Sequence, residues 1–102
     1  MRIISRKAIR TYWESYRGVD QPALENALKA WHHEVKAAVW TTTSDVKAKY
    51  RSASILKEGR VVFNICGNKF RLVAKINYPS GTLYIRWVGT HAEYDKINAE
   101  EV

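Results

Sequence analysis

Four side chains in the second half of the sequence have the chemistry needed to act on a phosphate group: Arg71, Arg86, His91 and Tyr94. Guanidinium groups stabilise negative charge that develops in a transition state, and an imidazole or a phenol can exchange a proton. Thr90 and Glu93 have the spacing of a capping box, so a helix is predicted to begin at His91 and to carry Tyr94 one turn later. In the alternative interpretation, His91 only starts this helix and Tyr94 only packs.

These groups have to be positioned by β-strands, and the strand pattern predicts how the strands pair. Apolar and polar residues alternate from residue 61 to residue 77, and Gly67-Asn68 is typical of a two-residue hairpin turn. This turn sets Ile65 opposite Phe70 and Asn64 opposite Arg71. One face of the second strand is then apolar, and the other face carries Lys69, Arg71, Lys75 and Asn77, interrupted by Val73.

A third strand is predicted after a four-residue loop at Pro79-Ser80-Gly81-Thr82. This loop length sets Ala74 opposite Trp87, Lys75 opposite Arg86 and Thr90 opposite Arg71, which brings His91 close to the Arg71 guanidinium. Two cations directly opposite each other destabilise a sheet by some tenths of a kcal/mol. The pair therefore indicates either a bound anion between the two side chains or side chains that extend separately into water.

The positive charge of the chain is concentrated along one part of the sequence. Residues 47–90 contain nine Lys or Arg and one acid, a local charge of +8, whereas the other residues carry eight basic and nine acidic side chains, or −1. The nine are Lys47, Lys49, Arg51, Lys57, Arg60, Lys69, Arg71, Lys75 and Arg86. This asymmetry predicts a nucleic acid or another polyanion as partner.

The remaining segments are predicted to form the scaffold of a single domain, residues 1–102. Residues 2–4 resemble an edge strand. A first helix begins after Ser5 and is closed by Gly18, and a second begins after Asp20 with Pro22 in its first turn. Their apolar stripes are expected to cover the apolar face of the sheet. Near Ser44-Asp45 a short helical turn is predicted, which leaves Lys47, Lys49 and Arg51 on a basic arm beside the sheet, or else on a solvated connector.

Several functional classes are not supported by the composition. The single cysteine, Cys66, gives no disulfide framework, and its spacing from the histidines fits no metal site. No apolar run approaches the roughly 20 residues of a membrane span, and residues 1–7 lack the apolar stretch of a signal peptide. We therefore expect a cytoplasmic protein that needs no cofactor or metal and does not contact a membrane.

Several motifs, in order, resemble one known family. They are Val62-Phe63-Asn64-Ile65 with Gly67-Asn68, then Phe70-Arg71-Leu72-Val73, then Ile85-Arg86, and finally Thr90-His91-Ala92-Glu93-Tyr94-Asp95. The chain is similar in these motifs to HigB-type toxins of bacterial type II toxin–antitoxin modules. The resemblance is close over residues 40–97, and the two N-terminal helices agree in layout.

The resemblance implies an α+β, RelE-like fold: an antiparallel sheet of three to four strands, two N-terminal helices packed on one face and a short C-terminal helix. It also implies an endoribonuclease that cuts mRNA on the ribosome by attack of the RNA 2′-hydroxyl, without a metal. Arg71, Arg86, His91 and Tyr94 are then expected to be catalytic. The residues expected to bind RNA are Lys47, Lys49, Arg51, Asn64, Lys69 and Lys75.

The implied partners are mRNA, the ribosome and a HigA-like antitoxin with a helix-turn-helix. The chain has no recognition helix of its own, so contact with DNA is expected only through the antitoxin. Two other functions remain open at this point. One is a noncatalytic RNA-binding or ribosome-binding module. The other is a RelE-fold toxin that poisons a protein such as gyrase, because one fold can host different activities.

Overall fold

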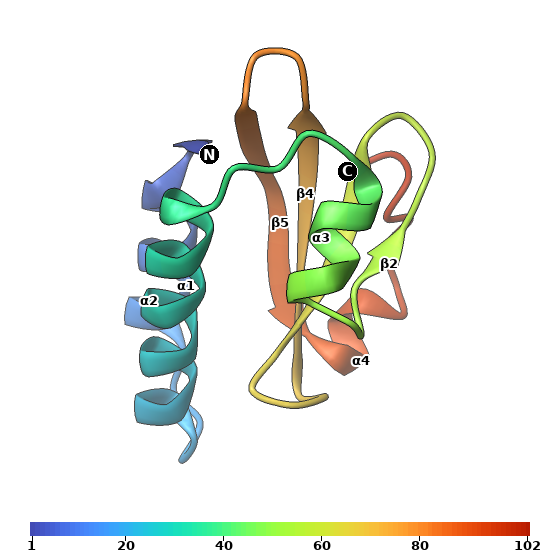
Figure 1. Ribbon diagram of the computed structural model, residues 1–102. Helices are drawn as coiled ribbons and strands as arrows, with labels where there is room; N and C mark the ends of the chain where they lie inside the picture. The colour runs from blue at the N-terminus through green and yellow to red at the C-terminus, as the bar shows by residue number, and fades with distance from the viewer.

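The computed structural model describes all residues, 1–102, and is organised around a five-stranded mixed sheet with the strand order β1-β5-β4-β3-β2 (Figure 1). The strands are β1 (Arg2–Ile4), β2 (Ser54–Ile55), β3 (Arg60–Ile65), β4 (Phe70–Asn77) and β5 (Thr82–Thr90). The helices are α1 (Arg6–Ser15), α2 (Gln21–Ala37), α3 (Thr43–Lys49) and α4 (His91–Tyr94). None of them has the length and apolar character that crossing a membrane requires.

The sheet is larger than predicted and is not wholly antiparallel. The N-terminal edge strand β1 is confirmed, but it runs parallel to β5, with Ile3 beside Leu83. The opposite edge is the two-residue strand β2, which the sequence analysis did not foresee because two residues give no period-two signal. The α+β class is confirmed, and the expected three to four antiparallel strands are corrected to five in a mixed sheet.

The main hydrophobic core lies between one face of the sheet and three helices. Helices α1, α2 and α3 contribute to one buried cluster with the apolar side chains of β3, β4 and β5. The predicted stripe of α2 is confirmed, since Leu24, Leu28, Trp31 and Val35 are all buried. The prediction of two helices on this face was incomplete because α3 also inserts a side chain, Val46.

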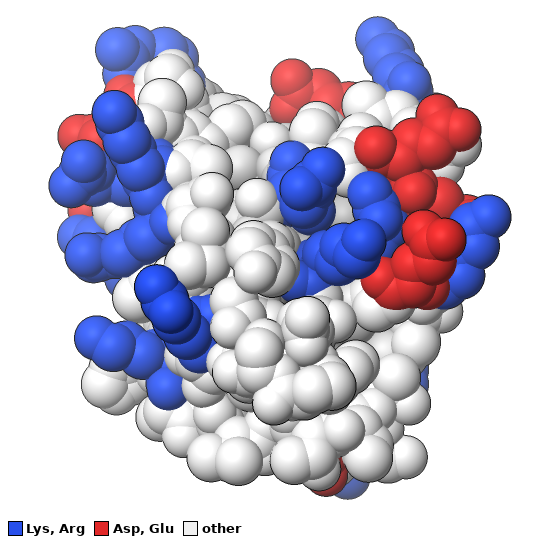
Figure 2. Space-filling view, turned by 90° about the horizontal axis from the view of Figure 1, so that it is seen from above, with Lys and Arg blue, Asp and Glu red and all other residues white.

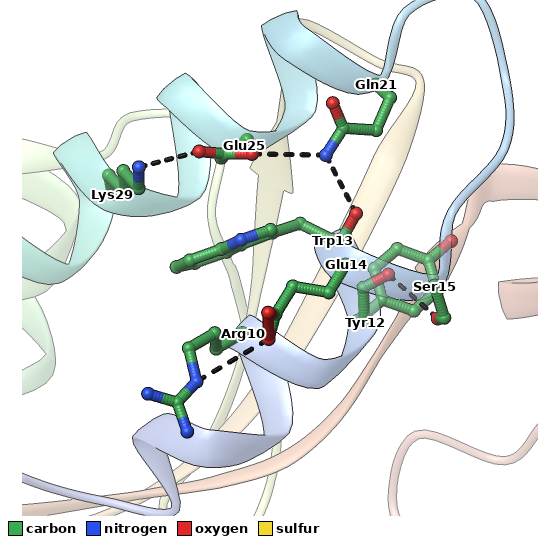
Figure 3. A network of polar contacts seen from close by, with 8 residues as sticks. All are labelled: Arg10, Tyr12, Trp13, Glu14, Ser15, Gln21, Glu25 and Lys29. Carbon is green, nitrogen blue, oxygen red and sulfur yellow. Dashed lines mark hydrogen bonds and ion pairs between the residues drawn. The ribbon is translucent and has the colours of Figure 1, made fainter.

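Helices α1 and α2 lie side by side and are held together by a polar network (Figure 3). The Gln21 side-chain amide donates to the backbone carbonyl of Trp13 at 2.8 Å and to Glu25 Oε1 at 3.2 Å. Glu25 in turn accepts from Lys29 Nζ at 2.6 Å, and this ammonium lies 5.5 Å from the centre of the Trp13 ring. The two bonds to Glu25, from Lys29 first and then Gln21, lower the pKa of its carboxyl group.

The helix boundaries differ from several predictions. Ser5 precedes α1 as expected, but its side chain makes no capping hydrogen bond. Gly18 does not close α1, because that helix ends at Ser15 with an extended residue following it. Helix α3 is capped by Thr42, whose hydroxyl accepts from the Asp45 backbone N–H, so Asp45 is the third helical residue of a capping box.

The predicted pairing of β3 with β4 is confirmed, including Ile65 opposite Phe70 and Asn64 opposite Arg71. The turn differs in detail, since residues 66–69 all lie outside the strands and the positive φ angles fall at Cys66 (55°) and Gly67 (67°). The register is nevertheless kept, because the alternation of apolar residues on both strands tolerates no one-residue slip.

The predicted pairing of β4 with β5 is wrong. The connecting loop is residues 78–81, and a bulge leaves Arg86 without a partner between the Ala74–Ile85 and Val73–Trp87 pairs. Lys75 therefore lies opposite Tyr84, and the expected pair of opposed cations does not form. The bulge also turns Trp87 to the face away from the helices. The sequence gives no period-two signal for a single inserted residue.

Phe63 lies at the centre of the aromatic core, and its removal is expected to show how strongly this packing holds the domain. Its ring is 5.4 Å from that of Trp31 and 5.2 Å from that of Tyr50. Phe63→Ala is expected to lower the free energy of unfolding by about 3–5 kcal/mol, measured by urea denaturation. The control is Val39→Ala, at an exposed position, which should change it by less than about 0.5 kcal/mol. A loss below about 1 kcal/mol for Phe63→Ala would contradict this packing.

Candidate active site

The sheet face away from α1, α2 and α3 carries the candidate catalytic residues, but it is not an open basic surface. Val62 and Val73 lie opposite each other on this face, outside the main core cluster, and are only 2% and 0% exposed. Residues 91–102 run along this side, with the Tyr94 ring 6.1 Å from the Trp87 ring and the Val102 carbonyl oxygen 2.7 Å from Arg60 Nη2. The predicted interruption of the basic face at Val73 is confirmed and is wider than expected, because Val62 is buried beside it and this apolar centre divides the face into two polar ends.

The first polar end is built around Arg71, which is 9% exposed. Its Nη1 atom donates to the backbone carbonyls of Asn68 (3.1 Å) and Phe70 (3.2 Å). Its Nη2 atom donates to Asn68 Oδ1 (2.6 Å) and to His91 Nδ1 (2.8 Å). Because the hairpin loop and a neighbouring ring hold the guanidinium on several sides, its orientation is fixed before any ligand arrives.

This network also fixes the hydrogen positions on His91. An arginine can only donate, so His91 Nδ1 is the acceptor and the ring hydrogen lies on Nε2 in the neutral form. His91 Nε2 lies 3.4 Å from Asp95 Oδ2, one turn further along the chain. The imidazole is therefore oriented from both sides, by a guanidinium and by a carboxylate, and its side chain is 44% exposed. The predicted proximity of His91 to Arg71 is confirmed.

Tyr94 completes this end of the face. Its ring lies 5.9 Å from the guanidinium carbon of Arg71, within the range of a cation–π contact. The other ring neighbour is Trp87, which the bulge at Arg86 turned toward the C-terminal segment. The structure therefore brings Arg71, His91 and Tyr94 together, as predicted, whereas Arg86 lies further along β5.

Helix α4 is positioned by the predicted capping box, which is confirmed. The Thr90 hydroxyl accepts from the Glu93 backbone N–H (3.1 Å), and Glu93 Oε1 accepts from the Thr90 backbone N–H (2.8 Å). Above all, this backbone hydrogen bond lowers the pKa of the Glu93 carboxyl group. Tyr12 of α1 also donates to Glu93 (3.4 Å), and burial together with this carboxylate raises the pKa of the Tyr12 hydroxyl. Helix α4 is thus tied to both β5 and α1.

Removal of the Thr90 cap should affect both the position of His91 and the stability of the protein, and a second cap separates the two effects. Thr90→Ala is expected to destabilise the protein by about 1 kcal/mol and to reduce any activity that depends on His91, because α4 loses its fixed start. Thr42→Ala removes the same kind of cap from α3 and should cost a similar amount of stability with full activity. Urea denaturation measures the stability of the two variants, and an activity assay measures how much activity each retains. Equal activity in the two variants would show that the α4 cap does not position His91.

The second polar end is a groove of about 690 Å³ that crosses the sheet from β5 to β2. Its lining includes three cations, one acid and two exposed apolar side chains: Arg60, Lys75, Arg86, Glu58, Ile55 and Tyr84. The groove is therefore basic overall and also offers apolar surface. This combination suits a charged ligand that also has a flat apolar part, such as a nucleotide.

Comparison with known proteins identifies the family. Residues 24–97 match the model of the family described as HigB_toxin, RelE-like toxic component of a toxin–antitoxin system. The chain is also 32% identical to the mRNA interferase toxin HigB of Escherichia coli strain K12 over 101 residues, which cover 97% of this chain and 92% of that protein. The mRNA interferase HigB of Shigella flexneri matches to the same extent. The chain belongs to the HigB toxin family.

In this HigB-family chain, the side chains of three residues predicted to bind RNA make contacts away from the two polar ends. Lys47 Nζ donates to the carbonyls of Arg51 and Ala53, at 2.7 and 2.8 Å, at the end of α3, and Lys49 lines a hollow beside α2. The backbone carbonyl of Lys69 accepts from the His91 backbone N–H (2.9 Å) at the first polar end, but its Nζ atom lies 3.9 Å from Asp20 at the start of α2.

Two more predicted RNA-binding residues have clear places. Asn64 is partly buried opposite Arg71, and its amide lies 3.5 Å from the Ser52 carbonyl. Arg51 is exposed, in the connection between α3 and β2. Of the six predicted RNA-binding residues, only Lys75 lines the groove. Binding of RNA by all six stays a prediction.

Four further residues at the two polar ends of this HigB-family chain were not predicted as functional. They are Asn68 and Asp95, which contact Arg71 and His91, and Arg60 and Tyr84, which line the groove. Asp95 had a signal, because it follows His91 by four residues on a predicted helix and such residues are neighbours. The others had none, since their roles depend on the hairpin loop, the bulge and the C-terminal segment.

The charge distribution in space also differs from the distribution along the sequence. Figure 2 shows Lys and Arg spread over several parts of this face, on the side of α1 and α2, nearer the middle and at the opposite edge, with most of the acidic side chains gathered beside the basic ones nearer the middle. Residues 91–102 carry four acids and one Lys, and Glu100 pairs with Lys57 at 3.0 Å. The acidic C-terminal segment therefore offsets part of the charge of residues 47–90.

Proposed function

We propose that this HigB-family chain is the toxin of a type II toxin–antitoxin pair and that it cleaves mRNA on the ribosome by attack of the RNA 2′-hydroxyl. The relatives described above are named mRNA interferases, which supports the substrate. The observation that carries the chemistry is the chain of contacts Arg71–His91–Asp95 on one sheet end. A fixed base beside a fixed cation is what transfer of a proton and stabilisation of a phosphate require.

The reaction we propose exchanges hydrogen bonds at His91. In the free protein, Arg71 Nη2 donates to His91 Nδ1, while Asp95 holds the opposite nitrogen. When RNA binds, the guanidinium donates to an oxygen of the scissile phosphate instead, and Nδ1 becomes free to accept the proton of the 2′-hydroxyl. The new bond forms between the 2′-oxygen and phosphorus, and the bond from phosphorus to the 5′-oxygen breaks. Tyr94, whose ring lies beside the Arg71 guanidinium, supplies the proton that this leaving oxygen takes up.

The other members of the site hold the reacting groups. Asp95 orients the imidazole and stabilises its charged form during the reaction. Asn68 and Phe70 keep the Arg71 guanidinium in place. Lys75 and Arg86 attract the RNA strand at the groove, so affinity for RNA should fall steeply with salt.

The partners in this proposal are mRNA, the ribosome and a HigA-like antitoxin with a helix-turn-helix. Contact with DNA occurs only through that antitoxin. The site of action is the cytoplasm, where ribosomes translate mRNA.

The function is tested by expressing the chain with and without the neighbouring antitoxin gene and mapping transcript ends during translation. The expected result is growth arrest and new mRNA ends only without the antitoxin, and no new ends when initiation is blocked. Arrest without new ends would contradict the proposal and indicate a noncatalytic RNA-binding or ribosome-binding protein. Loss of DNA supercoiling before loss of translation would instead indicate a gyrase toxin.

A further inference from the structure

Arg60 is a buried cation that pairs with no Asp or Glu side chain. It is 7% exposed. Its Nε atom is buried without any hydrogen-bond partner, and its Nη2 atom donates to the Val102 carbonyl at 2.7 Å. A buried guanidinium is costly unless it is paired and hydrogen-bonded, so the groups that Arg60 contacts indicate which ligands its position suits.

A second guanidinium points at the same acceptor. Arg86 Nε donates to the main-chain oxygen of Val102 at 3.2 Å, and Arg86 also pairs with no Asp or Glu side chain. Two guanidinium groups from different strands, β3 and β5, thus converge on one main-chain oxygen of Val102. The charged oxygens of a phosphate group suit such a pair of convergent donors.

We propose that Arg60 and Arg86 form a phosphate-binding subsite for the RNA strand, in addition to the scissile-phosphate position at Arg71. The proposal deepens the proposed function and rests on it for the identity of the ligand. Both arginines line the groove of about 690 Å³, and so do Lys75 and Tyr84. Tyr84 is 40% exposed and lies directly opposite Lys75, so its ring offers a surface for a base beside the bound phosphate.

The subsite is separate from the position of the chemistry. Arg60 pairs with Lys75, which follows Arg71 by four residues on β4, a separation of roughly 13 Å at about 3.3 Å per residue. The buried Val62 and Val73 lie between the two ends. The bound strand therefore extends from the Arg71–His91 end to the groove, with a neighbouring nucleotide at Arg60 and Arg86.

The Val102 carbonyl oxygen occupies the position of the phosphate oxygen in this structure. Apart from the two arginines, the side-chain contact that holds this segment is the Lys57–Glu100 pair, which is exposed, and such pairs contribute little. RNA and residues 100–102 therefore compete for the same two arginines, and removal of these residues should favour RNA.

Binding of a single-stranded RNA oligonucleotide with 2′-O-methyl groups throughout tests the subsite, because this probe cannot be cleaved by 2′-hydroxyl attack. Arg60→Gln and Arg86→Gln are each expected to weaken binding about tenfold at low salt and to make its salt dependence shallower. The matched control is Arg10→Gln, which removes one exposed positive charge from α1. Equal losses in all three variants would overturn the subsite.

Removal of residues 100–102 tests the competition. The truncated chain is expected to bind the probe several-fold more tightly than full-length Glu100→Gln/Glu101→Gln, which loses the same two acidic side chains but keeps Val102. Equal affinities would overturn the competition. Thermal unfolding checks that Arg60→Gln folds, and if it does not, the exposed Arg86→Gln decides. Because the probe is not cleaved, a chain that binds it as expected but never cuts mRNA would contradict only the proposed function.

Discussion

His91→Ala is expected to lower the rate constant of mRNA cleavage on ribosomes by about 10²- to 10⁴-fold, the range that removal of a general base or acid typically costs. His91 is the histidine held by both Arg71 and Asp95, and its side chain is partly exposed where a substrate can reach it. The loss should appear in single-turnover cleavage, with mRNA ends mapped by primer extension. It should not appear as lost stability, since the imidazole contributes little to the core.

Two further variants define the role of His91. Asp95→Asn keeps a similar shape but removes the charge that orients the imidazole, so a smaller loss of rate is expected than for His91→Ala. His33→Ala, in α2 on the other side of the sheet, should leave the rate unchanged. A fully active His91→Ala variant would remove His91 from the chemistry and leave Tyr94 as the candidate for proton transfer.

The parts of the fold that could be predicted from the sequence are those set by local patterns. The β3–β4 register follows from alternating apolar residues on both sides of a short turn, and the capping box at Thr90 is a four-residue motif. The α2 stripe follows from helical spacing. Each depends on neighbours within a few residues, so no knowledge of the rest of the chain was needed.

The parts that could not be predicted depend on contacts between distant segments. The loop between β4 and β5 is residues 78–81 instead of the predicted 79–82, and the bulge at Arg86 then adds one residue to β5. Strand β1 pairs in parallel with β5, although the two strands are far apart in the sequence, and no local pattern in either segment predicts this pairing. As a result, Lys75 was paired with Arg86 instead of Tyr84, and Trp87 was assigned to the wrong face.

The prediction that His91 lies near Arg71 is correct, although the predicted register is wrong by one residue. Thr90 lies opposite Phe70 instead of Arg71. The contact still forms because an arginine side chain reaches further than one residue along a strand. Counting charges along the sequence could not show that residues 91–102 lie against the basic strands. That long-range contact turns an expected open face into two ends separated by Val62 and Val73.

Arg71→Ala is expected to lower the rate constant of mRNA cleavage by about 10²- to 10³-fold from the loss of one fixed donor to the transition state, with a further loss because His91 is no longer oriented. Single-turnover cleavage measures this rate. Urea denaturation should show a loss of roughly 1–3 kcal/mol, since the acceptors at Asn68 and Phe70 lose their donor. Phe63→Ala is the control for stability, because it should lower the free energy of unfolding by more than Arg71→Ala does. The folded fraction of the Phe63→Ala protein should still cleave mRNA, so lost stability alone would not explain the lower rate of Arg71→Ala.

Arg71→Lys separates charge from geometry. Lysine keeps the positive charge, but a single ammonium group cannot donate at once to the Asn68 side chain, to two backbone carbonyls and to His91 Nδ1, as the planar guanidinium does. We therefore expect Arg71→Lys to bind uncleavable RNA nearly as well as the wild type and to cleave mRNA nearly as poorly as Arg71→Ala. Recovery of most of the cleavage rate by lysine would mean that charge alone matters, and the exchange of hydrogen bonds between His91 and the scissile phosphate would then be wrong.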